Sequence, residues 1–197
     1  MGVDAVEYRM RGLSDPRAID VIKRAAQMIG WKSRPSPMPR PAQGSLLVGR
    51  GFAYMRYKQA ENYVATAMEV AVEPETGTVT VRRVACAHDC GLIINPDGLR
   101  NQIEGSVAQT LSRALHEEVK FDRSHVTSVN WVSYPILTFP EAPPIEVALM
   151  TNPRCLRSAP ARLPLLLSPH HWPMPSLMLQ VCGCAQFRSR QLAFGAH

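Results

Sequence analysis

The chain has 197 residues, of which 46% are hydrophobic and 19% are charged, a composition typical of one or two packed domains. No apolar run reaches the roughly 18 residues of a spanning helix, and the N-terminus lacks a basic stretch followed by an apolar one, so the sequence predicts neither a membrane span nor a signal peptide. The default expectation is therefore a cytoplasmic protein. Its five cysteines, an odd number without a signal, do not suggest a disulfide framework.

The positive charge of the chain is concentrated in its C-terminal part. The net charge is +6, yet residues 151–197 contain no Asp or Glu at all and carry five arginines. The same segment contains six prolines and shows neither a helical nor a strand period. The basic character is thus a property of this tail, and its scattered arginines do not indicate a nucleic-acid-binding face.

The first predicted element is a helix that begins after Asp15. Asp15 is a suitable N-cap, Pro16 suits the first helical position, and Gly30 suits the residue that follows the end. Between them, apolar residues recur at helical spacing. Four closely spaced prolines then indicate an extended linker over residues 33–44.

A β-hairpin is predicted next. Apolar residues alternate over residues 64–72, a turn follows at 73–77, and the alternation restarts at Val79 with a shift of phase at Arg82 that suggests a bulge. Upstream, Gly49-Arg50-Gly51 lacks the third glycine of a nucleotide-binding loop, so we interpret it as a tightly packed turn.

The clearest helix is about 20 residues long, with Asp97 as its candidate cap and an apolar stripe at every fourth position. Gly105 lies in its interior, where glycine is unfavourable, which suggests that something approaches the helix closely there. Gln102 and Gln109 lie two turns apart and bracket this glycine. They form either a site for a polar, planar ligand or an ordinary exposed polar face. With further strands expected around 126–132 and 145–149, the predicted class is α+β, a β-hairpin and a long helix packed on a mixed sheet.

Other groups with chemical potential favour structural interpretations. The segment Cys86-x-His88-x-Cys90 has metal-binding residue types but no evident fourth ligand, so a buried cysteine at a strand end is the better interpretation. Glu117-Glu118 is interpreted as a solvated helix end, because adjacent residues of a helix point in different directions. The spacing of His170-His171 and Cys182-x-Cys184 matches no common zinc-binding pattern, so this segment is interpreted as one that does not bind metal.

Several motifs, in order, resemble the molybdenum hydroxylases, the xanthine dehydrogenase and aldehyde oxidase family. The similarity is strongest to the large, molybdopterin-binding subunit of the bacterial isoquinoline 1-oxidoreductase type, and it covers roughly residues 1–150. The central motifs are Asp89-Cys90-Gly91-x-x-Ile94-Asn95-Pro96, Asn101-Gln102-Ile103-Glu104-Gly105-x-x-x-Gln109 and Ala114-Leu115-x-Glu117-Glu118. Asp15-Pro16-Arg17, Gly30-Trp31, Gly49-Arg50-Gly51 and Tyr134-Pro135 also follow the family's order.

The resemblance implies an oxidoreductase that hydroxylates N-heterocycles or aldehydes at a molybdenum–molybdopterin centre, with water as the oxygen source. Electrons then leave through iron–sulfur clusters on a small partner subunit. Gln102 matches the family's glutamine that contacts the cofactor, and Gly105 matches the glycine that lets the helix pack close to it. Gln109 is a weaker correspondence, because Thr110 and Ser112 stand where the family has glycines.

Two departures from the family bear on activity. Most of the first cofactor-binding domain is absent, and the family's general base, the glutamate of a Gly-x-Gly-Glu motif, has no counterpart in residues 151–197. We therefore assign no catalytic residue and expect the chain as written to be inactive alone. The alternative is a non-catalytic remnant that at most binds a partner subunit.

A frameshift near residues 152–154 would explain the tail. If the tail is read one base late, the codons of Trp172-Pro173 and those of Met174-Pro175 can each encode only alanine across their junction. The amino-acid string recovered in this shifted frame fits Leu-Ala-Asn-Ala-x-x-Asp-Ala-Thr-Gly-x-Arg, which resembles the family's C-terminal signature. In the same shifted frame, the codons of residues 158–162 permit Gly-Ala-Gly-Glu, a form of the Gly-x-Gly-Glu motif that carries the family's general base. We therefore divide the chain into a helix and linker that continue from an absent upstream domain (1–44), an incomplete second molybdopterin-binding domain (45–150) and a frameshifted tail (151–197).

Overall fold

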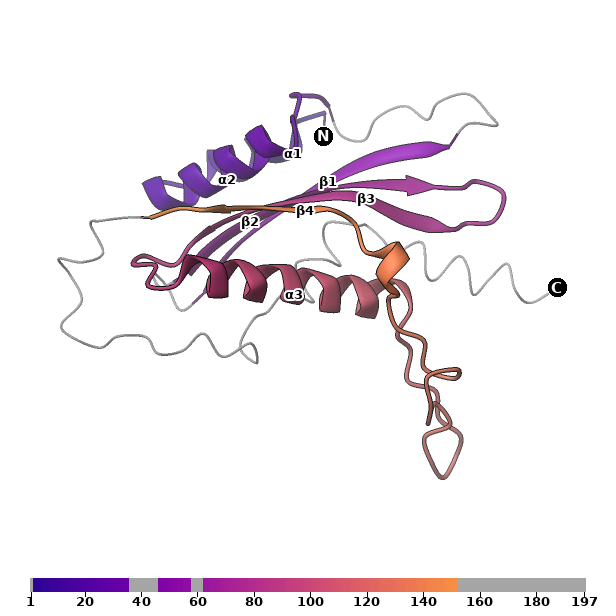
Figure 1. Ribbon diagram of the computed structural model, residues 1–197. Helices are drawn as coiled ribbons and strands as arrows, with labels where there is room; N and C mark the ends of the chain where they lie inside the picture. The colour runs from indigo at the N-terminus through magenta and orange to yellow at the C-terminus, as the bar shows by residue number, and fades with distance from the viewer. Residues whose placement is uncertain (1, 36–45, 58–61, 152–197) are drawn as a thin grey trace.

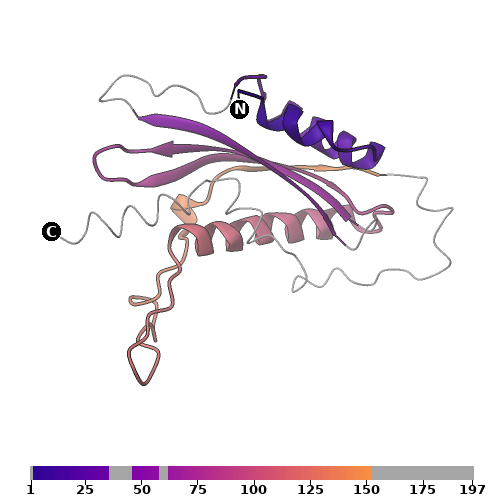
Figure 2. The same ribbon diagram turned by 180° about the vertical axis from the view of Figure 1, so that it is seen from behind.

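The computed structural model describes residues 2–35, 46–57 and 62–151. In this part of the chain a four-stranded sheet lies between two helical layers (Figures 1 and 2). Helices α1 (Ala5–Arg11) and α2 (Pro16–Met28) cover one face, and α3 (Pro96–Leu115) covers the other. The remaining elements are β1 (Leu47–Tyr57), β2 (Asn62–Val72), β3 (Val79–Asp89), the 3-10 turn η1 (Phe139–Glu141) and β4 (Ile145–Leu149).

The sheet is mixed, which confirms the predicted α+β class. Its order is β1-β2-β3-β4, with the first three strands antiparallel and β4 parallel to β3. The β2–β3 hairpin has its predicted bulge, because Glu69 pairs with Arg83 while Val70 pairs with Val81, leaving Arg82 as the extra residue. Since β3 and β4 are parallel, α3 is the crossover between them.

The two faces of the sheet carry different side chains because neighbouring residues of a strand point to opposite sides. Four fully buried alanines in β2 and β3 face α2: Ala65, Ala67, Ala85 and Ala87. Their small size lets α2 pack with Val21, Ile22 and Ala25 against the sheet. The opposite face presents larger side chains to α3: Val64, Met68, Val84 and Cys86. Burial on both faces makes this sheet the centre of the core.

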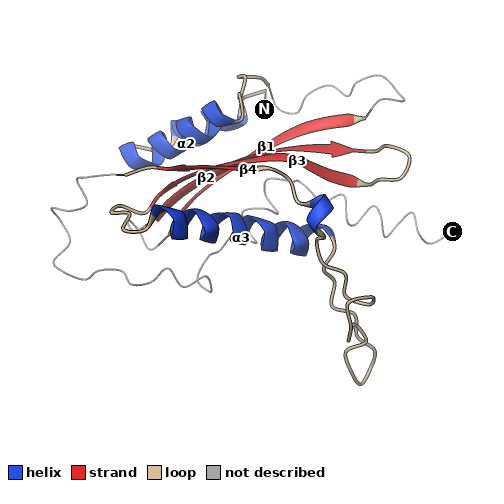
Figure 3. Ribbon diagram, in the orientation of Figure 1, coloured by secondary structure: helices blue, strands red, loops and turns tan. Residues whose placement is uncertain are grey.

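The structure corrects two predictions on strands. Gly49 and Gly51 are not in a turn but in β1, where they pair with Val70 and Met68 of β2. Residues 126–132 do not form a strand, because the only pairing described there is an isolated bridge between Phe121 and Val126. This segment belongs to an arm, residues 118–138, that extends away from the sheet without a neighbouring strand in the described part of the chain (Figure 3).

The predicted linker and tail fall largely outside the described residues. Residues 33–35 contain no helix or strand, while 36–44 and 152–197 are not described. The tail interpretation, including His170, His171, Cys182 and Cys184, therefore rests on the sequence alone. Where the structure describes the chain, it contains no helix with the length and apolar content needed to cross a bilayer.

Candidate functional site

Helix α3 carries the three residues that the sequence singles out, and all three are exposed on it: Gln102, Gly105 and Gln109. The opposite side of the helix is buried against the sheet through Leu99, Ile103, Val107 and Leu111. Apart from the neighbouring backbone of α3 itself, a methyl group added at Gly105 would meet no atom within 4 Å. The close approach expected at Gly105 is therefore not made by the described chain, and the space beside it is open. We call these three residues the outer stripe of α3.

The start of α3 is built by Asn95 rather than by Asp97, which corrects the predicted cap. The Asn95 side chain accepts a 2.9 Å hydrogen bond from the Gly98 N–H. Pro96 occupies the first helical position, where its missing N–H costs nothing, and Asp97 lies in the first turn. Both Asn95 and Asp97 are good capping types two positions apart, so the pattern located the helix start but not its cap.

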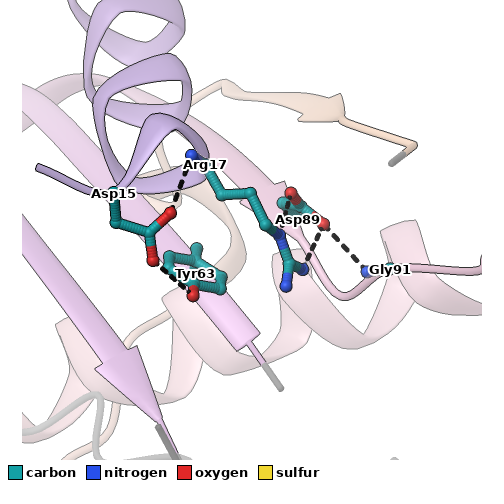
Figure 4. A network of polar contacts seen from close by, with 5 residues as sticks. All are labelled: Asp15, Arg17, Tyr63, Asp89 and Gly91. Atoms are coloured by element: carbon teal, nitrogen blue, oxygen red, sulfur yellow. Dashed lines mark hydrogen bonds and ion pairs between the residues drawn. The ribbon is translucent and has the colours of Figure 1, made fainter. Parts of the chain in front are cut away.

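A network of polar contacts joins α2 to the turn that leads into α3 (Figure 4). Arg17 donates two hydrogen bonds to Asp89, from Nε to Oδ2 at 2.8 Å and from Nη2 to Oδ1 at 2.7 Å. Asp89 Oδ1 also accepts the Gly91 N–H at 2.8 Å. Gly91 has φ +82°, a conformation that glycine adopts without strain. The carboxylate thus holds both α2 and the turn.

The same network fixes the N-terminus of α2. Asp15 accepts the Arg17 N–H at 3.0 Å and the Tyr63 hydroxyl at 2.7 Å. The Arg17 guanidinium lies 4.3 Å from the centre of the Tyr63 ring, a cation–π contact. The hydrogen bond from Tyr63 lowers the pKa of Asp15, while burial together with this bond raises the pKa of Tyr63. Sequence reasoning missed this network. Arg17 and Asp89 entered only as members of the quoted motifs, Tyr63 had no signal, and only Asp15 was given a structural role, as the helix cap.

The C-terminal half of α3 accommodates the two residues that depart from the family's glycines. The Thr110 hydroxyl donates to the Ser106 carbonyl at 2.7 Å, and the Ser112 hydroxyl accepts the Leu137 N–H at 3.0 Å. Both side chains are buried, and each has a hydrogen-bond partner. The helix therefore packs here without a conflict from Thr110 or Ser112.

The cysteine and histidine of β3 lie in the core. Cys86 and His88 are fully buried, and burial raises the pKa of the Cys86 thiol to about 11 and lowers that of His88 to about 4. Among the described residues, no group of three or more His, Cys, Asp or Glu could hold a metal ion. The burial of Cys86 confirms the buried-cysteine interpretation, although Cys86 lies inside β3 and not at its end. Cys90 is only half-buried.

The glutamates after α3 do not form a carboxylate pair. Glu117 accepts a 2.7 Å hydrogen bond from the Tyr134 hydroxyl and is half-buried, whereas Glu118 is exposed beside Lys120. The predicted solvated helix end is therefore correct for Glu118 and wrong for Glu117, because Tyr134 folds back onto it.

Comparison with known proteins identifies the class of domain. Residues 20–143 match the family described as the molybdopterin cofactor-binding domain. The chain is 48% identical over 155 residues to one of the subunits of nicotinate dehydrogenase from Pseudomonas putida, and 33% identical over 157 residues to the beta subunit of isoquinoline 1-oxidoreductase from Brevundimonas diminuta. The chain belongs to the molybdenum hydroxylase family and contains a molybdopterin cofactor-binding domain.

The chain spans a small part of these relatives. The matches cover 76% and 79% of this chain but only 13% and 19% of the respective relatives. Among solved structures, quinoline 2-oxidoreductase from Pseudomonas putida 86 overlaps with a TM-score of 0.45 at 27% identity, over 46% of this chain and 12% of that one.

Proposed function

We propose that this chain is a part of the molybdopterin-binding large subunit of an oxidoreductase that hydroxylates N-heterocycles or aldehydes, with water as the oxygen source. The observation that carries the proposal is the outer stripe of α3, which is exposed in a domain of the molybdopterin cofactor-binding family. In the same proposal, residues 45–150 are an incomplete second cofactor-binding domain, and residues 1–44 continue from an upstream one.

The outer stripe suits a flat, polar ligand such as a pterin. The amides of Gln102 and Gln109 each offer two N–H donors and one carbonyl acceptor without a charge. Gly105 between them leaves room for a ligand to approach the helix backbone. We assign Gln102 and Gln109 to hydrogen bonds with the cofactor and Gly105 to close contact with it. When bound, the molybdenum–molybdopterin group supplies the oxidation of the substrate carbon.

The chain as written lacks the acid–base residue that such a reaction uses. Residues 151–197 contain no Glu, so the family's general base has no counterpart in them. Loss of a general base typically lowers the rate by about 10²–10⁴-fold. We therefore propose that the chain is inactive alone. An active assembly would also need a small subunit with iron–sulfur clusters, as well as a heterocycle or aldehyde substrate.

A second candidate is a non-catalytic remnant that at most binds a partner subunit, and the missing glutamate favours it. Bound pterin distinguishes the two proposals. The full chain is expressed in a host that makes the molybdenum cofactor, and pterin is measured by fluorescence after oxidative release. We expect pterin in the wild-type chain and several-fold less in Gln102→Ala. Glu104→Ala is the control, because residue 104 is half-buried on a different side of α3. A wild-type chain without pterin would support the remnant.

A further inference from the structure

The turn between β3 and α3 has few apolar anchors of its own. Leu92 and Ile94 are exposed, and Cys90 and Ile93 pack only partly against the core. The turn is instead tied by Asp89, whose side chain is 5% exposed and whose Oδ1 accepts the Gly91 N–H. The hydrogen bond of Asp89 to the turn therefore fixes how the chain leaves β3 and enters α3.

Arg17 determines where the Asp89 carboxylate can lie. Its guanidinium donates to both carboxylate oxygens, and this bidentate geometry restrains the rotation of the carboxylate as well as its position. Arg17 itself is held by its own N–H on Asp15 and by the Tyr63 ring. The arginine side chain is only 14% exposed, so solvent weakens this pair little. A lysine would keep the charge but could not form the two parallel bonds.

We propose that Arg17 is a positioning residue for the outer stripe of α3. Acting through Asp89, it holds the turn at Gly91 and so sets the place where α3 begins on the sheet. Gln102 and Gly105 follow within the next turns of the same rigid helix. An error at the start of the helix therefore displaces both of them together. The inference rests on the proposed function in so far as the stripe receives the pterin.

The test compares Arg17→Gln and Asp89→Asn with Arg50→Gln in the full chain. Arg50 is a matched control because it also makes a 2.8 Å ion pair, with Glu69, but this pair joins β1 to β2 and does not contact the turn. Two readouts are measured, namely hydrogen exchange of the amides of residues 91–99 and retained pterin. Arg17→Lys is the milder variant in case Arg17→Gln does not fold.

We expect exchange at residues 91–99 to rise about tenfold or more in Arg17→Gln and Asp89→Asn, since each loses a charge-assisted contact, and not in Arg50→Gln. Retained pterin should fall several-fold in the same two variants, even where Arg50→Gln lowers the melting temperature equally. Arg17→Lys should lie between wild type and Arg17→Gln. Unchanged exchange at 91–99 in Arg17→Gln, or in Arg17→Lys if the former is unfolded, would overturn the proposal. Absence of pterin from the wild-type chain would instead contradict the proposed function, and the exchange data would still decide the positioning role.

Discussion

The hydroxyl of Tyr63 in β2 donates a 2.7 Å hydrogen bond to Asp15, the residue that caps α2. The two residues are 48 positions apart, yet the bond places the N-terminus of the helix on one defined point of the sheet. Tyr63 is 2% exposed, so its hydroxyl has little access to water as an alternative partner. Asp15 therefore serves both the local cap and the packing of the first helical layer.

Tyr63→Phe should destabilise the fold by roughly 1.5–3 kcal/mol, the usual worth of a hydrogen bond to a charged group. The ring and its contact with Arg17 remain in this variant, so the change isolates the hydroxyl. Urea unfolding of both chains measures the difference. Tyr8→Phe, in α1, is the control for loss of a tyrosine hydroxyl, because Tyr8 is 62% exposed. A Tyr63→Phe chain as stable as wild type would show that the Asp15 contact contributes nothing.

The pKa of Asp15 is lowered, first by the hydrogen bond from Tyr63. A lowered carboxyl pKa means that the folded state prefers the charged form. The resulting stability is present above the ordinary Asp pKa of 3.8 and is lost as the pH falls through the folded value. In Asp15→Asn the acid-induced loss of stability below about pH 4 should be smaller than in wild type. Equal acid profiles would contradict this assignment.

His88 should make the domain sensitive to mild acid. Burial lowers its pKa to about 4 from an ordinary value of 6.5. Between these values the unfolded chain binds a proton that the folded chain does not, so stability falls as the pH drops from 6.5 toward 4. His88→Gln should flatten the pH dependence in this window, whatever its stability at pH 7. Unfolding at a series of pH values tests it, and an unchanged slope would refute the role of His88.

The arm that follows α3 should promote association. With the adjacent Phe139 it carries apolar side chains that are largely exposed, among them Phe121, Trp131 and Val132. Large exposed apolar patches are aggregation liabilities in an isolated domain. Replacing Trp131, Val132 and Phe139 with serine should reduce self-association, while each change alters the free energy of unfolding by no more than about 0.5 kcal/mol. Light scattering measures the association, and an unchanged profile would exclude the arm as its cause.

Local patterns predicted much of the fold. The hairpin, its bulge, α2 and α3 follow from periods of 2 and 3.6 and from capping residues, and the structure confirms them. β1 was missed because Gly49 and Gly51 indicate a turn locally, whereas pairing with β2 makes them part of a strand. The Arg17–Asp89 ion pair joins residues 72 positions apart, and no local pattern reveals such a contact.

The candidate site was predictable only in part. Seven-residue spacing placed Gln102 and Gln109 on one side of a helix, and both are exposed there. Spacing alone could not distinguish a binding surface from a polar face, and the resemblance to a family was needed to assign the cofactor. The open space beside Gly105 became visible only in three dimensions.

The proposed frameshift predicts a definite nucleotide sequence. Across the codons for residues 145–197, the shifted frame should encode Gly-x-Gly-Glu followed by the recovered signature. Sequencing of independently prepared DNA tests this. If the new DNA sequence has a single missing or extra base, the tail is a sequence error. If the DNA has no such base and the shifted frame still encodes the signature, the tail results from gene decay. A shifted frame that encodes neither motif would contradict the frameshift.

The most direct test of the central claim is retained pterin in Gly105→Ala. Alanine should stabilise this exposed helical position by about 0.5–1 kcal/mol, because glycine loses more conformational freedom in a helix. Apart from the neighbouring backbone of α3, the added methyl group would meet nothing within 4 Å. If the outer stripe of α3 receives the cofactor, the same methyl group should reduce retained pterin several-fold, so stability and binding change in opposite directions. Retention equal to that of wild type would contradict the assignment of the stripe as the cofactor site.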